Sequence, residues 1–333
     1  MTLDFKHSQA AHCENGVTSN LLRYYGVDVS EAVIFGISSG LFFAYLPFLK
    51  VNGLPITSFR PLPGMIFQRT ATNLGIKVYR KKFRNKEDSM AALDKALDAG
   101  IPVGLQVGVF NLTYFPKPYR FHFNAHNIVV FGKENGHYII SDPVMETVES
   151  LSYEELLRVR WARGALEPKG QMYYPLKVPA KIDVAPAIRK GIKKNCRDML
   201  TIPVPLFGIK GIRYLSKKIK KWPEQLGDNK AALYLGQLIR MQEEVGTGGA
   251  GFRFIYAAFL QEAAAILHNN RLLDISQAMT DTGDRWRDFA VIAGRIIKKR
   301  SGEGESYAIL SNILAEIAER ERAVFSELKK FIP

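Results

Sequence analysis

One cysteine lies where an alanine-rich lead-in changes into an amphipathic helix. Cys13 occupies the stretch "AAHCENGVTSNLLRYYG", residues 10–26, just ahead of the first helical turn. The unpaired N–H groups and the positive dipole end of a helix N-terminus stabilise a thiolate, which is the reactive form of cysteine. The position predicts a nucleophile, with a packed structural thiol as the alternative.

A catalytic thiol also needs a base, usually a histidine that a carboxylate or an amide holds in place. The stretch "AHNIVVFGKENGHYIISDP", residues 125–143, offers such a pair in two β-like runs around "KENG". With KENG as a four-residue hairpin loop, Gly132 pairs with His137, and His126 comes within one position of Asp142 across the hairpin. This register predicts His126 as the base and Asp142 as its orienter, whereas "SDP" alone indicates only a turn after a strand.

The elements that must position these residues follow from hydrophobic periodicity. Residues 15–25 and 87–99 carry apolar side chains at helical spacing, and each segment is followed by a glycine. Residues 102–110 form a short β-like run, and residues 127–143 read as the hairpin. Helices followed by antiparallel strands predict an α+β domain.

The composition changes near residue 175, where a proline-rich stretch leads into a basic, helical region. The segment 181–222 holds 12 Lys or Arg against two acidic residues, a local net charge of +10. Residues 224–333 predict several amphipathic helices. We therefore expect a catalytic domain at 1–175 and a basic, mainly α-helical domain at 176–333.

The overall charge favours an acidic partner. The chain has 333 residues and a net charge of +14, so nucleic acid, an anionic membrane surface or an acidic protein would be attracted to it. No nucleic-acid motif accompanies the charge, so nucleic acid is disfavoured. Peripheral membrane contact and an acidic protein partner stay open.

Compartment, membrane and metal content are also constrained by the sequence. The N-terminus lacks a signal-peptide pattern, and the two cysteines cannot form a disulfide framework, so we expect a cytoplasmic protein. The longest apolar run, residues 32–49, is broken by Gly, Ser and Pro and predicts buried interior instead of a membrane span. No Cys or His pair has metal-ligand spacing, so we expect no metal site.

Four stretches together resemble the butirosin biosynthesis protein H family: "HCE" before a helix ending in "YYG", "FGISSGLFFAYLP", the hairpin, and "GTGGAGFRFIYAAFLQEAA". The first half also resembles the papain-like, bacteriocin-processing peptidase fold, in which a cysteine opens a helix and a histidine begins a strand closed by Asp-Pro. These resemblances imply Cys13 as nucleophile, His126 as base and Asp142 as orienter. The peptidases carry an oxyanion-donating glutamine several residues before the cysteine. Gln9, only four residues upstream, is the candidate here at a spacing that departs from that pattern.

The butirosin resemblance implies an acyltransferase of natural-product biosynthesis. Such an enzyme moves an acyl group from an acyl carrier protein to an amine-bearing small molecule through a cysteine acyl-enzyme. It needs no tightly bound cofactor, because the carrier delivers the phosphopantetheine thioester. An acidic carrier would be attracted to the basic segment 181–222. The alternatives are a cysteine peptidase or amidase with the same residues, and a catalytically silent binding protein.

Two further segments are candidates for substrate contact. "GTGGAG" matches a dinucleotide-binding pattern but follows a helix, so it predicts a turn whose Gly248 and Gly249 N–H groups, with Arg253, face a phosphopantetheine phosphate or a carboxylate. A tight turn between helices is the alternative. The aromatic stretch 111–123, with Tyr114 and Tyr119, predicts either the lining of an acyl or acceptor pocket or a packed loop.

Overall fold

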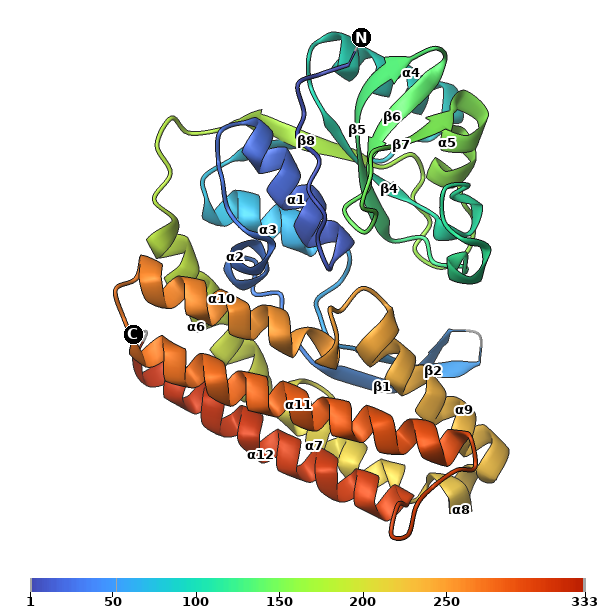
Figure 1. The fold of residues 1–333 in the computed structure, drawn as a ribbon, viewed down its shortest axis with the longest axis vertical. Coiled ribbons are helices and arrows are strands. Elements are labelled where there is room, and N and C mark those ends of the chain that lie inside the picture. Colours follow the sequence, from blue (N-terminus) through green and yellow to red (C-terminus); the bar gives the residue numbers. More distant parts are fainter. Residues whose placement is uncertain (1, 52, 332–333) are drawn as a thin grey trace. The chain divides into compact units, whose positions relative to one another are not determined.

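A computed structural model describes residues 2–51 and 53–331 (Figure 1). The chain forms two compact units, and the first contains residues up to 34 together with 63–183. The second contains residues 35–62 together with 184 onward. The units are interleaved along the chain, which differs from the single boundary expected after residue 175.

A six-stranded antiparallel sheet forms the centre of the first unit, with the strand order β3-β8-β4-β5-β6-β7. The strands are β3 (Lys77–Lys81), β4 (Val103–Val107), β5 (His126–Glu134), β6 (His137–Ser141), β7 (Glu149–Ser152) and β8 (Met172–Lys177). The second unit is mainly helical, so the predicted α+β fold class is confirmed.

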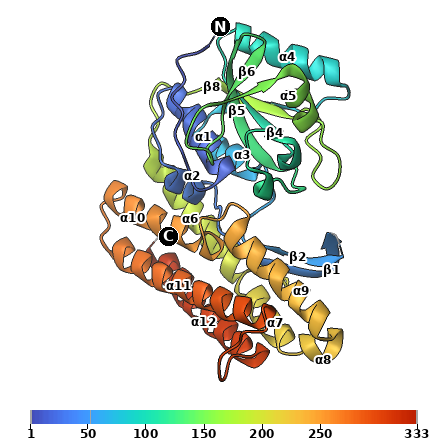
Figure 2. The same ribbon diagram turned by 45° about the vertical axis from the view of Figure 1, so that its right-hand side comes forward.

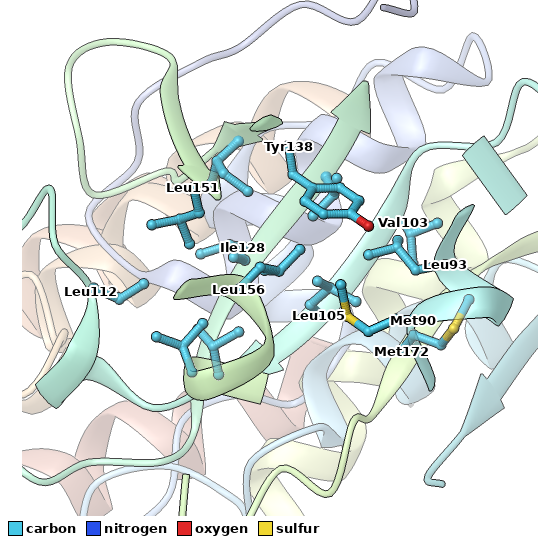
Figure 3. Close-up of a cluster of buried hydrophobic side chains, with 14 of the residues drawn as sticks. Met90, Leu93, Val103, Leu105, Leu112, Ile128, Tyr138, Leu151, Leu156 and Met172 are labelled. Carbon is cyan, nitrogen blue, oxygen red and sulfur yellow. The ribbon is translucent and has the colours of Figure 1, made fainter. Parts of the chain in front are cut away.

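Helices cover both faces of this sheet (Figure 2). One face packs against α1 (Cys13–Tyr24) and α3 (Met65–Asn73), and the other packs against α4 (Lys86–Asp98) and α5 (Tyr153–Arg160). Alternate residues of each strand point to opposite faces, which is the period-2 geometry of a strand. Ile128 therefore enters the core under α4 and α5 (Figure 3), whereas its neighbour Val129 enters the core under α1.

The helix that carries the cysteine begins as the sequence predicts. His12 is its N-cap, and its Nδ1 accepts a hydrogen bond from the Asn15 N–H at 3.3 Å. The helix ends at Tyr24, and Gly26 follows with a φ of 81°, a left-handed conformation that glycine adopts without strain. The predicted helix at 87–99 is also present, as α4.

The hairpin β5–β6 is present, but its predicted loop is wrong. Glu134 pairs with His137 across a two-residue turn, in which Asn135 and Gly136 have φ values of 48° and 79°. Asn-Gly favours this turn because both residues tolerate positive φ. A register shift between Val130 and Gly132 then inserts an extra residue into β5.

Nearly all of the second unit is helical, as the sequence predicts for the C-terminal part. Its helices are the last residues of α2 (Glu31–Ile37), α6 (Val184–Leu200), α7 (Gly208–Ile219), α8 (Trp222–Leu226), α9 (Asp228–Ile239), α10 (Arg253–Ile266), α11 (Arg271–Ile297) and α12 (Tyr307–Phe331). A π-helical turn, Arg240–Glu244, follows α9. Within residues 2–51 and 53–331, none of the helices combines the length and the apolar character that crossing a membrane requires.

Aromatic packing explains why residues 35–62 belong to the second unit. Phe43 and Phe59 are buried, and their ring centroids lie 5.5 Å apart. The Phe59 ring in turn meets Trp286 of α11 edge-on at 5.4 Å. Such ring pairs add to the free energy gained from burying the rings themselves.

The apolar run at 32–49 is only partly interior. It supplies the end of α2 and the start of the strand β1 (Ala44–Val51), which pairs with β2 (Leu54–Ser58) in a separate two-stranded sheet. Phe48 near the end of the run is 67% exposed. The prediction of buried interior therefore fails for the last residues, because this hairpin leaves one side uncovered.

Candidate active site

Cys13 is the first residue of α1, and the side chain of Glu31 holds the backbone just before it. The Glu31 carboxylate accepts hydrogen bonds from the N–H groups of Ala11 at 3.0 Å and His12 at 3.3 Å. Burial raises the pKa of Glu31, although these two hydrogen bonds act in the opposite direction. These hydrogen bonds tie the backbone that precedes Cys13 to the start of α2.

The next residue, Glu14, anchors a neighbouring helix. Its buried carboxylate accepts the N–H groups of Ile66 at 2.9 Å and Phe67 at 3.4 Å. These N–H groups belong to the first turn of α3, where no intrahelical acceptor is available. Glu14 therefore acts as an N-terminal cap supplied by another helix, and it fixes α3 against α1.

His126 and Asp142 form a buried hydrogen-bonded pair. Nε2 of His126 lies 2.7 Å from Oδ2 of Asp142, and the exposed fractions of the two side chains are 6% and 0%. The Asp142 carboxylate also accepts the Tyr114 hydroxyl at 2.8 Å and the Val144 N–H at 3.1 Å. Three donors therefore surround the buried carboxylate and fix its position beside the His126 ring.

The charge state of the histidine results from opposing effects. Burial lowers the pKa of His126, but attraction to Asp142 and Cys13, with hydrogen bonds to both, outweighs burial and raises the pKa to about 10. Since Nε2 is bound to Asp142, Nδ1 is the ring nitrogen left for the Cys13 thiol. At neutral pH the geometry therefore favours an imidazolium beside a thiolate.

The structure also brings Asn127 to the cysteine, which the sequence interpretation missed. Its Nδ2 lies 3.9 Å from the Cys13 Sγ. Strand alternation places the side chain of Asn127 on the other face of the sheet from that of His126. It does not identify the face that α1 covers, so the sequence carries no local signal for the contact with Cys13.

The other predicted residues of the first unit lie in different places. Tyr114 donates to Asp142, so it belongs to the hydrogen-bond network of the His126–Asp142 pair. Tyr119 is 66% exposed, and Gln9 is exposed as well. The ring of Phe115, from the same aromatic stretch, meets His126 edge-on at a centroid distance of 5.5 Å. The aromatic stretch thus supports the histidine directly.

The glycine turn belongs to the second unit, and two of its N–H groups, those of Gly249 and Ala250, bind acceptors within the protein. The Gly249 N–H donates to Thr247 Oγ1 at 3.0 Å, and the Ala250 N–H donates to the Glu243 carboxylate at 3.1 and 3.2 Å. Gly248 and Gly249 have φ values of 64° and 88°, so they supply the left-handed backbone of the turn. A carboxylate of the chain itself occupies the position proposed for an anion.

Arg253 does not face a free ligand either. Its guanidinium is fully buried, and Nε and Nη2 bind the two Glu321 oxygens at 2.9 and 3.1 Å. The Trp286 indole donates to the same carboxylate at 2.8 Å. The predicted anion site at Gly248, Gly249 and Arg253 is therefore not supported, because internal partners already engage the Gly249 N–H and the Arg253 guanidinium.

The second cysteine has a different environment. Cys196 is buried in α6, and burial raises its pKa to about 12. It is therefore a protonated, packed thiol at neutral pH. Among the described residues, no group of three or more His, Cys, Asp or Glu side chains is arranged to hold a metal ion.

Comparison with known proteins gives two family matches and a structural likeness. Residues 154–328 match the domain of unknown function DUF4872, and residues 12–143 match the N-terminal region of butirosin biosynthesis protein H. A crystal structure described as that of a C39-like peptidase from Bacillus anthracis is similar at a TM-score of 0.36 and 14% identity, covering 52% of this chain and 95% of that one. No curated protein matches the chain.

The second match spans the whole of the cysteine, histidine and aspartate cluster and confirms the resemblance read from the sequence. The first match covers more than half of the chain. The chain therefore belongs to the DUF4872 family, and its residues 12–143 are similar to the N-terminal region of butirosin biosynthesis protein H.

Proposed function

We propose that the protein is a cysteine acyltransferase, which moves an acyl group from a carrier-protein thioester to an amine. The observation that carries this proposal is the cluster of Cys13, His126 and Asp142, with the 2.7 Å hydrogen bond between the last two. In this proposal Cys13 is the nucleophile, His126 is the acid and base, and Asp142 orients the imidazole.

The first half-reaction forms an acyl-enzyme. The Cys13 thiolate attacks the thioester carbon, the carbon–sulfur bond to phosphopantetheine breaks, and the His126 imidazolium gives its proton to the departing thiolate. One thioester replaces another, so the step costs little free energy. The acyl group then sits on Cys13 beside a neutral His126.

The second half-reaction forms the amide. The acceptor amine attacks the acyl carbon, His126 takes a proton from the amine, and the bond to the Cys13 sulfur breaks. Cys13 leaves as a thiolate beside an imidazolium, which restores the starting state. A peptidase or amidase would use the same three residues with water as the second nucleophile, so the identity of the acceptor separates the two functions.

An acidic acyl carrier protein is the donor we propose. In α7 and just beyond it, Lys217, Lys220 and Lys221 are exposed, and within the described residues no acidic side chain pairs with them. Such a surface speeds encounter with an acidic protein by long-range attraction. The carrier would bring its own phosphopantetheine, so the enzyme needs no tightly bound cofactor.

We place the enzyme in the cytoplasm, where carrier proteins and amine acceptors meet under reducing conditions. Among the described residues, neither Cys13 nor Cys196 forms a disulfide. A reducing compartment preserves that state, which the proposed nucleophile requires.

Intact-mass spectrometry tests this function directly. The protein is mixed with short acyl groups on an acyl carrier protein, and we expect a mass increase of one acyl group that maps to Cys13. Cys13→Ala should abolish the adduct, while Cys196→Ala should retain it because that thiol is protonated and packed. Addition of a panel of amines should then discharge the adduct faster than buffer alone.

Two results would contradict the proposal. Discharge by water at the same rate with and without every amine would identify a hydrolase. No adduct on Cys13 from any thioester, together with a folded protein, would favour a binding protein.

A further inference from the structure

The strand β5 begins with His126, and the next residue, Asn127, presents a polar side chain on the other face of the sheet. Val129 and Phe131 of β5 pack with Val17 and Leu21 of α1. Asn127 has the same parity, so its side chain lies on the α1 face, where it is 3% exposed. A buried amide in such a core must have partners for its donors and its acceptor.

Three hydrogen bonds use those groups and set the orientation of the amide. Oδ1 of Asn127 accepts the Tyr173 hydroxyl at 2.8 Å. Nδ2 donates to the Ala125 carbonyl at 3.1 Å and points to the Cys13 Sγ at 3.9 Å. Exchanging the oxygen and nitrogen would set the amide oxygen against the Ala125 carbonyl oxygen, and two acceptors repel. The N–H side of the amide therefore faces the sulfur.

Tyr173 is itself firmly placed. Its ring packs on Phe67 at a centroid distance of 4.6 Å, and it fills the space above Gly104, where an added Cβ would come within 2.4 Å of the ring. Burial, and then the nearby Glu14 and Cys13 charges, hold its pKa well above the usual range. The hydroxyl thus stays protonated and donates to Asn127 throughout the working pH range.

We propose that Asn127 is a further catalytic residue, which donates a hydrogen bond to the thiolate of Cys13, and that Tyr173 is its positioning residue. The inference rests on the proposed function, in which Cys13 is the nucleophile. Hydrogen bonds strengthen when the acceptor is charged, so the contact favours the thiolate over the thiol. The Cys13 thiolate is then stabilised twice, by the charge of the His126 imidazolium and by the N–H group of the neutral Asn127 amide.

This second source of stabilisation affects both half-reactions. Before acylation it increases the fraction of Cys13 present as thiolate at a given pH. During amide formation the sulfur regains its negative charge as the leaving group, and the same N–H is already in place to receive it. Asn127 should therefore influence the rate of discharge as well as the rate of acylation.

The test is the pH dependence of iodoacetamide labelling at Cys13, followed by mass spectrometry. Asn127→Leu keeps the approximate shape of the side chain but removes the donor, and it should raise the pH midpoint of labelling by about one unit. Asn127→Asp should raise it further, because a carboxylate repels the thiolate. Tyr173→Phe removes only the hydroxyl that orients the amide and should raise the midpoint by a smaller amount.

Gln106→Leu is the matched control. Gln106 is the cross-strand partner of Asn127 in β4, and its amide donates to the backbone carbonyls of Asn124 and Leu166. Its loss removes a buried amide of the same sheet whose described hydrogen bonds go to backbone carbonyls and not to the Cys13 sulfur. We expect a lower melting temperature and an unchanged midpoint.

The outcomes distinguish this inference from the function on which it rests. Rapid labelling of the wild type with the same midpoint in all three variants would overturn the role of Asn127 and leave the nucleophile intact. Slow labelling of the wild type, no faster than Cys196, would overturn the nucleophile itself. Should Asn127→Leu not fold, Tyr173→Phe decides the question, because it preserves the ring packing.

Discussion

At the scale of single residues, the central feature is the protonation of His126 between Asp142 and Cys13. Burial alone would make His126 neutral, but the Asp142 carboxylate and Cys13 reverse that effect and raise the pKa to about 10. Asp142 can exert this effect because its own burial is compensated by Tyr114 and Val144. Tyr114, for which the sequence predicted either a pocket lining or a place in a packed loop, donates its hydroxyl to this aspartate.

The two cysteines should differ in reactivity. Cys13 should react with iodoacetamide well below pH 8, because the imidazolium and the helix N-terminus favour its thiolate. Cys196, whose pKa burial raises to about 12, should react at least about tenfold more slowly at pH 7. Peptide mapping after timed labelling of native protein measures both rates. Equal rates for the two thiols would refute the nucleophile assignment.

Asp142→Asn should change catalysis more than stability. The variant removes the attraction that raises the pKa of His126 and favours the wrong tautomer, so we expect acyl transfer to fall about 10²- to 10⁴-fold. The raised pKa stabilises the folded state fully below about 6.5, and this contribution is lost as pH rises through about 10. The gap in unfolding free energy between wild type and variant should therefore narrow between those pH values.

Urea denaturation at several pH values measures that gap. Asp94→Asn is the control, since Asp94 accepts the Tyr138 hydroxyl at 2.8 Å in the same unit without contacting His126. A gap that widens toward high pH would contradict the assigned charge state.

At the scale of elements, local signals predicted α1 and α4, because caps and periodicity are properties of neighbouring residues. The hairpin was found, but its turn was misplaced. The Asn-Gly turn and the bulge in β5 shift the pairing register of the hairpin in opposite directions. Val130 therefore pairs with Ile140, only one residue from the predicted partner. The histidine and aspartate consequently still meet. Asn127 and the supporting Tyr173 come from separate strands, which no local pattern connects.

A glycine allows α1 to lie close to the segment that carries the orienter. A Cβ added at Gly16 would come within 2.5 Å of the Pro143 Cβ and 2.6 Å of the Ala10 Cβ. Both neighbours are small and attached to the backbone, so Gly16→Ala should lower the unfolding free energy by about 1–3 kcal/mol and reduce acyl transfer. Gly294→Ala in α11 meets no atom within 4 Å and should raise stability by about 0.5–1 kcal/mol.

Chemical denaturation of both variants provides the comparison. A Gly16→Ala protein as stable and as active as the wild type would show that α1 can shift away from Pro143 without cost to the site.

At the scale of the whole molecule, the net charge of +14 predicts a salt-sensitive partnership. A carrier-bound acyl donor should acylate Cys13 faster than the same acyl group on free pantetheine. That advantage should shrink once the Debye length falls below about 8 Å. Four exposed lysines lie in and just after α7: Lys217, Lys218, Lys220 and Lys221. Reversing their charge by substitution with Glu should reduce the advantage about tenfold and leave iodoacetamide labelling of Cys13 unchanged.

The control reverses an equal number of exposed cations elsewhere, at Lys77, Arg84, Lys86 and Lys95, and alters the net charge by the same amount. Equal losses in both variants would assign the effect to overall charge. A rate independent of salt, and equal for both donors, would exclude electrostatic docking of a carrier.

The chain crosses between its two units after residues 34, 62 and 183, and this threading limits how such a protein can be rearranged by evolution or by cloning. The region that matches the butirosin protein, residues 12–143, contains the 35–62 segment, whose Phe43 and Phe59 are buried in the helical unit. A fragment that ends near residue 183 would leave those rings without their packing partner and should aggregate. Recombination at that point would likewise damage both halves, so we expect the two regions to be inherited as one gene segment.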